Sequence, residues 1–265
     1  AISPDGRLLA YLATDAGGLT RIWLRPINSL TAQQLAGTDN AWGPFWSPDS
    51  RYLGFFADGK LKKIAVADGS PEVICDAPDG RGGAWSKDGV IVFAPVAAGG
   101  LLRVPADGGE PVEVMRPDSS RHETGLRFPR FLPDGKHFLF VSLPPHRGNH
   151  DVYLGTLGST GRESLLVSAT APVYAEPGYL ILVRNGRLLA QRFDAEKLKP
   201  VGDAMPLGEA PPGSGTASAP AVSVSSNGIL AHPAAGLPNT QLVWLDRAGR
   251  PQGTVALPPG RYSDV

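Results

Sequence analysis

The chain has 265 residues, of which 33 are glycine and 26 are proline, so about one residue in five disfavours a helix interior. This composition excludes a helical bundle, whereas a hydrophobic fraction of 42% is enough to fill a core. The 25 basic residues balance 25 acidic ones, which argues against nucleic acid or an anionic membrane surface as a partner. An all-β fold with many turns remains.

The cysteine content and the length of the apolar runs indicate whether the chain has a reactive thiol or a membrane-spanning segment. The single cysteine, Cys75, lies in an apolar run and is expected to be a buried, inert thiol. The longest apolar stretches, 8–13 and 179–183, have strand length and fall far short of the ~20 residues of a membrane helix. We therefore expect no direct membrane insertion by these residues. The sequence begins without Met or a signal-like segment, which favours a piece of a longer protein.

A turn-forming tetrad recurs along the chain. Proline presets φ, Asp or Asn favours turns, and Gly accepts a positive φ, so each tetrad predicts a tight reversal between two strands. The tetrads begin 44, 39, 46, 43 and 50 residues apart. They are Ser3-Pro4-Asp5-Gly6, Ser47-Pro48-Asp49-Ser50, Ser86-Lys87-Asp88-Gly89 and Leu132-Pro133-Asp134-Gly135, with weaker copies at Ala175-Glu176-Pro177-Gly178 and Ser225-Ser226-Asn227-Gly228.

Strand-like segments surround every tetrad. Short apolar segments follow the turns at 7–12, 51–56, 90–93, 136–141, 179–183 and 229–232. Alternating segments come next, at 21–25, 60–64, 101–104, 152–154, 187–191 and 241–245. A third strand follows a Gly-bearing hairpin in several units, and a further strand precedes the next tetrad. Four antiparallel strands in each unit of ~44 residues are typical of a propeller blade.

The number of units predicts the architecture. Six blades need about 264 residues, so the sequence predicts an all-β fold, a six-bladed β-propeller with four antiparallel strands per blade, as one domain over 1–265. The predicted blades cover approximately residues 1–46, 47–85, 86–131, 132–174, 175–224 and 225–265. Residues 261–265 resemble a lead-in strand that would close the ring with the N-terminal segment. Continuation into further blades stays open.

Two family resemblances follow from these motifs. The Ser-Pro-Asp-Gly-Arg type of turn with its apolar strand, at 3–12 and 47–56, resembles the TolB-type, WD-like β-propeller repeat of bacteria. The runs 55–64, 84–91, 130–138 and 242–247 resemble the propeller region that lies C-terminal to bacterial eukaryotic-type serine/threonine kinases. That resemblance implies a membrane-tethered parent with a kinase domain and a periplasmic or cell-surface propeller that acts as a sensor or scaffold. The chain itself has neither a Gly-rich nucleotide loop nor a His-Arg-Asp catalytic loop.

The remaining motifs favour a binding module over an enzyme. His146 and His150 are four residues apart, but they lie in a Pro- and Gly-bearing segment and not on a helix face. There is no Gly-x-Ser-x-Gly elbow, and the Asp residues of the tetrads lack the ligand run of a calcium loop. We expect no catalytic residue, no metal and no cofactor. Two alternatives stay open: a propeller hydrolase or gating propeller of a serine peptidase, and a TolB-like adaptor for proteins of the cell envelope.

Equivalent positions in the repeat predict a binding site at one mouth of the central channel. The fifth residue before three successive tetrads carries an indole or a guanidinium group, and such groups are frequent anchors of partners. The predicted mouth residues are Trp42, Arg81, His122, Glu123, Arg127 and Tyr174. We expect a protein, peptide or small anionic ligand there. The alternative is that the arginines bond carbonyl groups of neighbouring blades.

The position immediately before each tetrad carries a different pattern. It is Trp46, Trp85 and Phe131 in three successive units, so it is aromatic each time. Large rings at a fixed position of a repeat predict contacts between one blade and the next.

Overall fold

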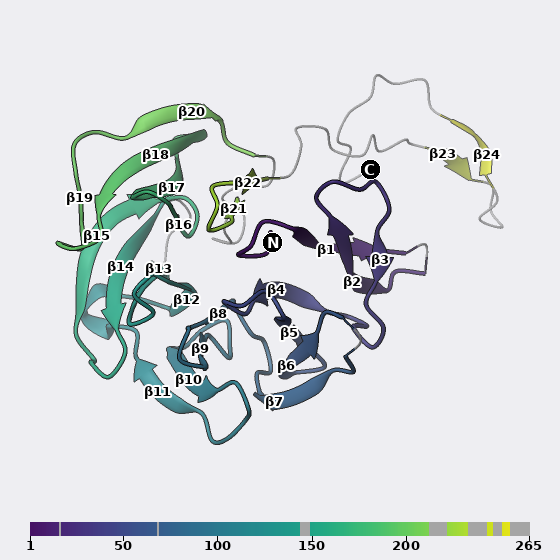
Figure 1. Ribbon diagram of the computed structural model, residues 1–265, viewed down its shortest axis with the longest axis horizontal. Helices are drawn as coiled ribbons and strands as arrows, with labels where there is room; N and C mark the ends of the chain where they lie inside the picture. The colour runs from purple at the N-terminus through teal and green to yellow at the C-terminus, as the bar shows by residue number, and fades with distance from the viewer. Residues whose placement is uncertain are drawn as a thin grey trace.

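Five antiparallel sheets follow one another around a ring, seen face on in Figure 1. The structure is a computed structural model that describes residues 1–15, 17–67, 69–143, 149–211 and 222–232, and the strands 243–245 and 251–254. These residues contain one helical element, the three-residue 3-10 helix η1 (Ser119–Arg121). No helix in the described ranges is long and apolar enough to cross a membrane.

The sheets contain three to five strands each. The first consists of β1 (Leu8–Thr14), β2 (Thr20–Pro26) and β3 (Gln33–Gln34). The second consists of β4 (Trp42–Trp46), β5 (Tyr52–Ala57), β6 (Lys60–Ala65) and β7 (Glu72–Asp76). The third consists of β8 (Gly83–Trp85), β9 (Val90–Phe93), β10 (Leu101–Pro105) and β11 (Val112–Met115).

The fourth and fifth sheets complete this series. The fourth consists of β12 (Gly125–Phe131), β13 (His137–Leu143), β14 (His150–Thr156) and β15 (Arg162–Ser168). The fifth consists of β16 (Val173–Ala175), β17 (Tyr179–Arg184), β18 (Arg187–Asp194), β19 (Lys199–Pro200) and β20 (Met205–Glu209). In the second to fifth sheets, the strand that precedes a tetrad pairs with the strand that follows it, so these tetrads connect the first two strands of a sheet.

The tetrads form tight turns, as the sequence predicts. In the fourth sheet the backbone N–H of Gly135 donates to the carbonyl of Leu132 at 2.9 Å, and Gly135 has a φ of +71°, which favours glycine. The buried side chain of Ser47 closes another turn. Its hydroxyl donates to the carboxylate of Asp49 at 2.6 Å and accepts from the backbone N–H of Tyr52 at 2.9 Å. The serine and the acid therefore hold the turn together.

Apolar side chains fill the spaces between adjacent sheets. Phe45 and Phe56 of the second sheet pack in one cluster with Ile91 and Phe93 of the third. Burial of such a side chain stabilises the fold by about 1.5–3 kcal/mol. Cys75 belongs to this cluster, and its burial raises the pKa of the thiol to about 11, in agreement with the predicted inert thiol.

Aromatic contacts between blades also occur where the sequence predicts them. The Trp85 ring of the third sheet lies 6.0 Å, centroid to centroid, from the Tyr52 ring of the second. Trp46 is 8% exposed and packs in the cluster between the first and second sheets. These contacts stack one sheet on the next.

The described residues form five blades, so the prediction of a six-bladed propeller is wrong. The tetrad at Ser225 does form a turn, between β21 (Ser223–Val224) and β22 (Leu230–Ala231), but this pair stays two-stranded. β23 (Val243–Leu245) and β24 (Pro251–Thr254) pair with each other, and no other described strand pairs with them. The physical reason is that a blade requires hydrogen bonds between the β21–β22 pair and the β23–β24 pair, and the described strands form none. The first blade also departs from the expectation, since it has three strands.

The β21–β22 pair lies between the fifth sheet and the N-terminal segment (Figure 1). An apolar cluster that includes Val222 and Leu230 joins the pair to the fifth sheet. The other side is polar: the backbone N–H of Ile2 donates to the Ser223 hydroxyl at 2.9 Å, and that of Ser226 donates to the Pro4 carbonyl at 2.8 Å. The ring thus closes around a central space.

Candidate functional site

A cavity of about 390 Å³ lies at the centre of the ring, where the innermost strands end in the tetrads. Its walls come from β4, β8, β12 and β16, from the tetrads after them, and from the β21–β22 turn with the N-terminal segment. We call it the tetrad-end cavity. The lining residues used below are Phe45, Trp46, Ala84, Trp85, Lys87, Arg130, Phe131, Val173, Tyr174, Glu176, Ser223 and Ser226.

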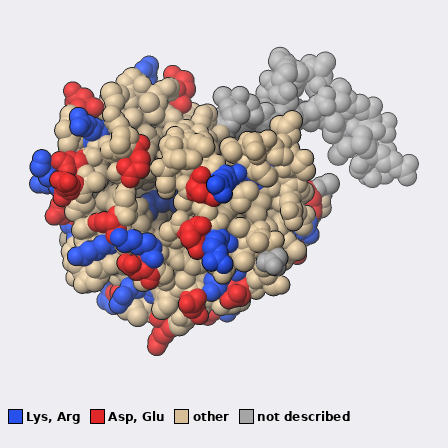
Figure 2. Space-filling view, viewed as in Figure 1, with Lys and Arg blue, Asp and Glu red and all other residues tan. Residues whose placement is uncertain are grey.

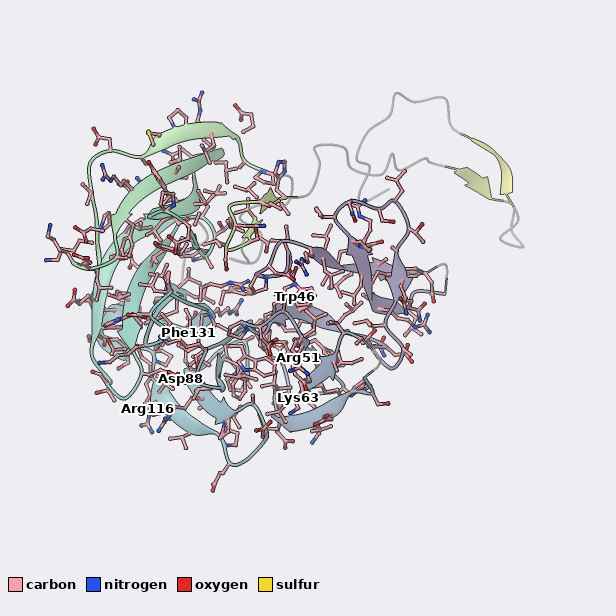
Figure 3. The ribbon with its side chains drawn as sticks, viewed as in Figure 1. Trp46, Arg51, Lys63, Asp88, Arg116 and Phe131 are labelled. Carbon is pink, nitrogen blue, oxygen red and sulfur yellow. The ribbon has the colours of Figure 1, made fainter. Side chains whose placement is uncertain are left out.

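The labelled side chains in Figure 3 help to locate this cavity. Trp46 and Phe131 lie nearer the centre of the ring than Lys63 and Arg116. Figure 2 shows Lys and Arg interspersed with Asp and Glu over the same face. Surface charge therefore does not single out one region, and the shape and lining of the cavity mark the candidate site.

Arg130 is the basic residue in the wall of this cavity that lies deepest. Its Nε has no contact with solvent and no hydrogen-bond partner, and its guanidinium forms no ion pair with any residue in the described ranges. Burial lowers the pKa of Arg130 to about 10, so the side chain is still charged at neutral pH. The cavity wall therefore contains a partly buried positive charge that has no counter-ion among the described residues.

The neighbouring polar side chains of the wall are already engaged. The Tyr174 hydroxyl donates to the Glu176 carboxylate at 3.3 Å, and burial raises the pKa of Tyr174. The Tyr174 ring also packs edge-on against Phe193, with centroids 6.3 Å apart. These contacts fix the phenol beside the cavity. The two basic side chains of the lining, Arg130 and the exposed Lys87, form no ion pair with any described residue.

Three of the predicted mouth residues come together near the other end of the same strands. Arg81 lies over the Trp42 ring, 5.4 Å from its centroid, and pairs with Asp79 at 2.6 Å. Arg127 donates from Nε and Nη2 to the carbonyl of Ala97, at 3.1 and 2.8 Å. Burial and then the positive charge of Arg81 lower the pKa of Arg127. Both guanidinium groups thus have protein partners.

The other three predicted residues lie elsewhere. The Glu123 carboxylate is 4% exposed, accepts from Arg162 at 2.8 Å and accepts from the backbone N–H of Asp118 at 2.7 Å. His122 is an exposed residue that caps η1 with a φ of +56°. Tyr174 lines the tetrad-end cavity. The six residues therefore fall into three groups, and their role as one binding site stays a prediction.

Sequence reasoning missed Arg130, although the repeat carried a signal for it. Arg130 is the second residue before its tetrad. The same position is Phe45, Ala84, Val173 and Ser223 in other units. All of these residues line the cavity, so one charge stands at a position that is otherwise uncharged.

No group of three or more His, Cys, Asp or Glu side chains that could hold a metal ion occurs within the described residues. The acidic residue of the cavity wall, Glu176, carries the hydrogen bond from Tyr174. The chemistry of this wall is therefore that of the Arg130 guanidinium, the Lys87 ammonium, hydroxyl groups and aromatic rings, which suits recognition of a ligand.

Comparison with known proteins places the fold. No protein-family model matches the chain, and no curated protein matches it. A protein described as TolB from Agrobacterium tumefaciens is 23% identical, with 63% of this chain and 64% of that chain covered and a TM-score of 0.54. TolB from Acinetobacter baumannii is 14% identical, with 78% and 54% covered and a TM-score of 0.59. An oligogalacturonate lyase from Vibrio parahaemolyticus is 13% identical, with 86% and 83% covered and a TM-score of 0.54.

These similarities show a shared fold and nothing finer, because every identity is below 25%. The predicted TolB-type β-propeller is confirmed at that level. The chain spans 64% and 54% of the two TolB proteins, so what those proteins do as a whole does not transfer to it. The resemblance to kinase propellers stays a prediction.

Proposed function

We propose that this chain is a non-catalytic propeller that binds a ligand or partner in its central channel. The observation that carries the proposal is the tetrad-end cavity, whose volume of about 390 Å³ lies in the range of about 300–1,000 Å³ found for ligand pockets. Aromatic rings from β4, β8 and β12 supply apolar walls, and the Arg130 guanidinium supplies a directional polar contact. Rings and guanidinium groups are the side chains that most often anchor partners.

The chemistry of the wall supports recognition better than proton transfer. A guanidinium group with a pKa of about 10 stays protonated at neutral pH and cannot act as a general base there. The phenol of Tyr174 has a raised pKa because of burial, so it also keeps its proton. The Arg130 guanidinium is suited to donate hydrogen bonds to a bound molecule, whereas the Tyr174 proton is already donated to Glu176.

We further propose that the domain is the extracytoplasmic sensor of a membrane-tethered bacterial serine/threonine kinase. The support is the sequence resemblance of runs such as 55–64 and 130–138 to kinase propellers. An adaptor role at the cell envelope, or a gating role beside a hydrolase, would require a different parent protein. The neighbouring domains encoded with this chain distinguish these cases: a kinase domain upstream supports the sensor, and a hydrolase domain downstream supports the gate.

A thermal-shift screen tests the binding function. The chain is heated with peptides, sugars, nucleotides and divalent ions, and a ligand at 100 times its Kd stabilises the native state by about 2.7 kcal/mol. We expect at least one class to raise the Tm by several degrees. Ser226→Trp, an exposed change at the rim of the cavity, should abolish the shift, whereas Ser70→Trp, an exposed change outside the cavity, should leave it intact.

The same screen also tests the predicted mouth. If a ligand still raises the Tm of the Arg81→Ala and Arg127→Ala double variant, that ligand does not require the two arginines of the predicted mouth. No shift with any class, or equal shifts in Ser226→Trp and the parent chain, would remove the proposal of a channel ligand.

A further inference from the structure

The residues two positions before each tetrad form a ring around the tetrad-end cavity. They are Ala1, Phe45, Ala84, Arg130, Val173 and Ser223, and every one of them lines the cavity. The repeat thus gives one inward-facing position per unit, and four of its members are apolar. Because alanine and valine fill this position elsewhere, packing of the ring does not require an arginine there.

Among the described residues, the Arg130 side chain lacks the protein partners that Arg127 and Arg162 have. Arg162 pairs with Glu123 at 2.8 Å, and Arg127 donates twice to the Ala97 carbonyl. Arg130 has neither kind of partner within the described residues, and its Nε has no contact with solvent. A partly buried charge has lost some of its hydration without a protein partner in return, so an anion that reaches it gains by neutralising it.

We propose that Arg130 binds the carboxylate group of the ligand that occupies the tetrad-end cavity. This inference rests on the proposed binding function and adds the chemical class of the ligand. A guanidinium group matches a carboxylate with two parallel N–H···O bonds, and such charge-assisted pairs are short and strong.

A single carboxylate fits this wall better than a group of higher charge. Of the two basic side chains in the lining, Lys87 is exposed and Arg130 is the more buried one. The Arg130 guanidinium neutralises one negative charge, and the walls at Phe45, Trp85 and Val173 are apolar. Glu176, which also lines the cavity, would repel a second negative charge. The ligand is therefore a monoanion with an apolar or neutral body, held by Arg130 at its acidic end.

Such a carboxylate can belong to the C-terminus of a peptide or to a sugar acid, and paired probes separate these sources. Acetyl-Ala-Ala-Phe with a free C-terminus is compared with its C-terminal amide, and glucuronate is compared with glucose. Isothermal titration calorimetry of the 265-residue chain at pH 7 measures each Kd. In one of the two pairs, we expect the acid to bind at least tenfold more tightly than its neutral partner.

Variants of Arg130 assign that preference to the guanidinium group. Arg130→Met keeps the length of the side chain without its charge and should reduce the acid-to-neutral ratio to about one. Arg130→Lys keeps the positive charge but loses the two parallel N–H donors of the guanidinium group. It should retain only part of the preference for the acid probe. Arg103→Met, an exposed change in β10 outside the cavity, is the matched control and should leave the ratio unchanged. The Tm of each variant checks that the chain is folded.

The outcomes separate this inference from the function on which it rests. If acid and neutral probes bind alike, or if the preference survives in Arg130→Met, the carboxylate assignment is wrong while channel binding stands. The assignment is also wrong if only uncharged compounds of the wider screen bind in the channel. If no probe binds and no compound of the screen raises the Tm, both the inference and the binding function are overturned.

Discussion

Arg127 and Arg130 lie in the same strand, β12, yet they meet opposite surroundings. The Arg127 guanidinium donates twice to the carbonyl of Ala97 in the preceding blade, so it ties two blades together. Arg130 lines the tetrad-end cavity, and among the described residues it has no partner for its Nε. The comparison teaches that residue type does not decide the role of an arginine here. The partners that the fold supplies decide whether it stabilises the ring or is available to a ligand.

The largest expected effect on stability comes from removing the carboxylate partner of Arg162, which leaves that arginine without an ion pair as short as its present one. Glu123→Ala removes the carboxylate that pairs with Arg162 at 2.8 Å and leaves a largely buried guanidinium group with a weaker partner. We expect the free energy of unfolding to fall by about 2–4 kcal/mol, measured by urea denaturation. Glu163→Ala, at an exposed position beside Arg162, should change it by less than about 0.5 kcal/mol. Equal effects of the two substitutions would mean that the pair contributes no specific stability.

A direct test of the comparison replaces each arginine of β12 by methionine. Arg127→Met leaves the Ala97 carbonyl without its two donors, so the free energy of unfolding should fall by about 1–3 kcal/mol. Arg130→Met removes a partly buried charge that has no counter-ion among the described residues, so stability should stay the same or rise. Urea denaturation of both variants provides the measurement. A similar loss in both would show that Arg130 also has a structural role.

A smaller effect is expected for a neutral side chain, the Ser47 hydroxyl, which has protein partners for both its donor and its acceptor. Ser47→Ala removes the hydroxyl that donates to Asp49 and accepts from the Tyr52 N–H, so we expect a loss of about 1–2 kcal/mol in the free energy of unfolding, again measured with urea. Ser119→Ala, at an exposed position, is the control and should change stability by less than about 0.5 kcal/mol. A Ser47→Ala variant as stable as this control would show that the tetrad serine is dispensable for its turn.

Local features of the fold were predictable because they depend on neighbouring residues. The tetrads at Ser3, Ser47 and Leu132 turn as predicted, since the residues that set their φ angles lie within four positions of one another. The inert thiol of Cys75 and the contact of Trp85 with the preceding blade were predictable from an apolar run and a repeat position. The TolB-type β-propeller fold followed from the same repeat.

The number of blades was not predictable in this way. The unit that begins at Ser225 has the local pattern of a blade, but β22 is only two residues long and β23 and β24 pair with each other. Whether four strands join one sheet depends on hydrogen bonds between residues far apart in the sequence. A count of turns does not contain that information.

The sequence by itself determined the turns and the strands between them, because these follow from backbone preferences and a regular spacing. Only the tertiary structure decided which arginine is satisfied. A β-bulge interrupts β12 between Arg127 and Arg130, with Phe128 at a φ of +52°, so simple alternation does not predict where the two side chains point. The position of the Ala97 carbonyl in the neighbouring blade then provides a partner for one arginine and leaves the other facing the cavity.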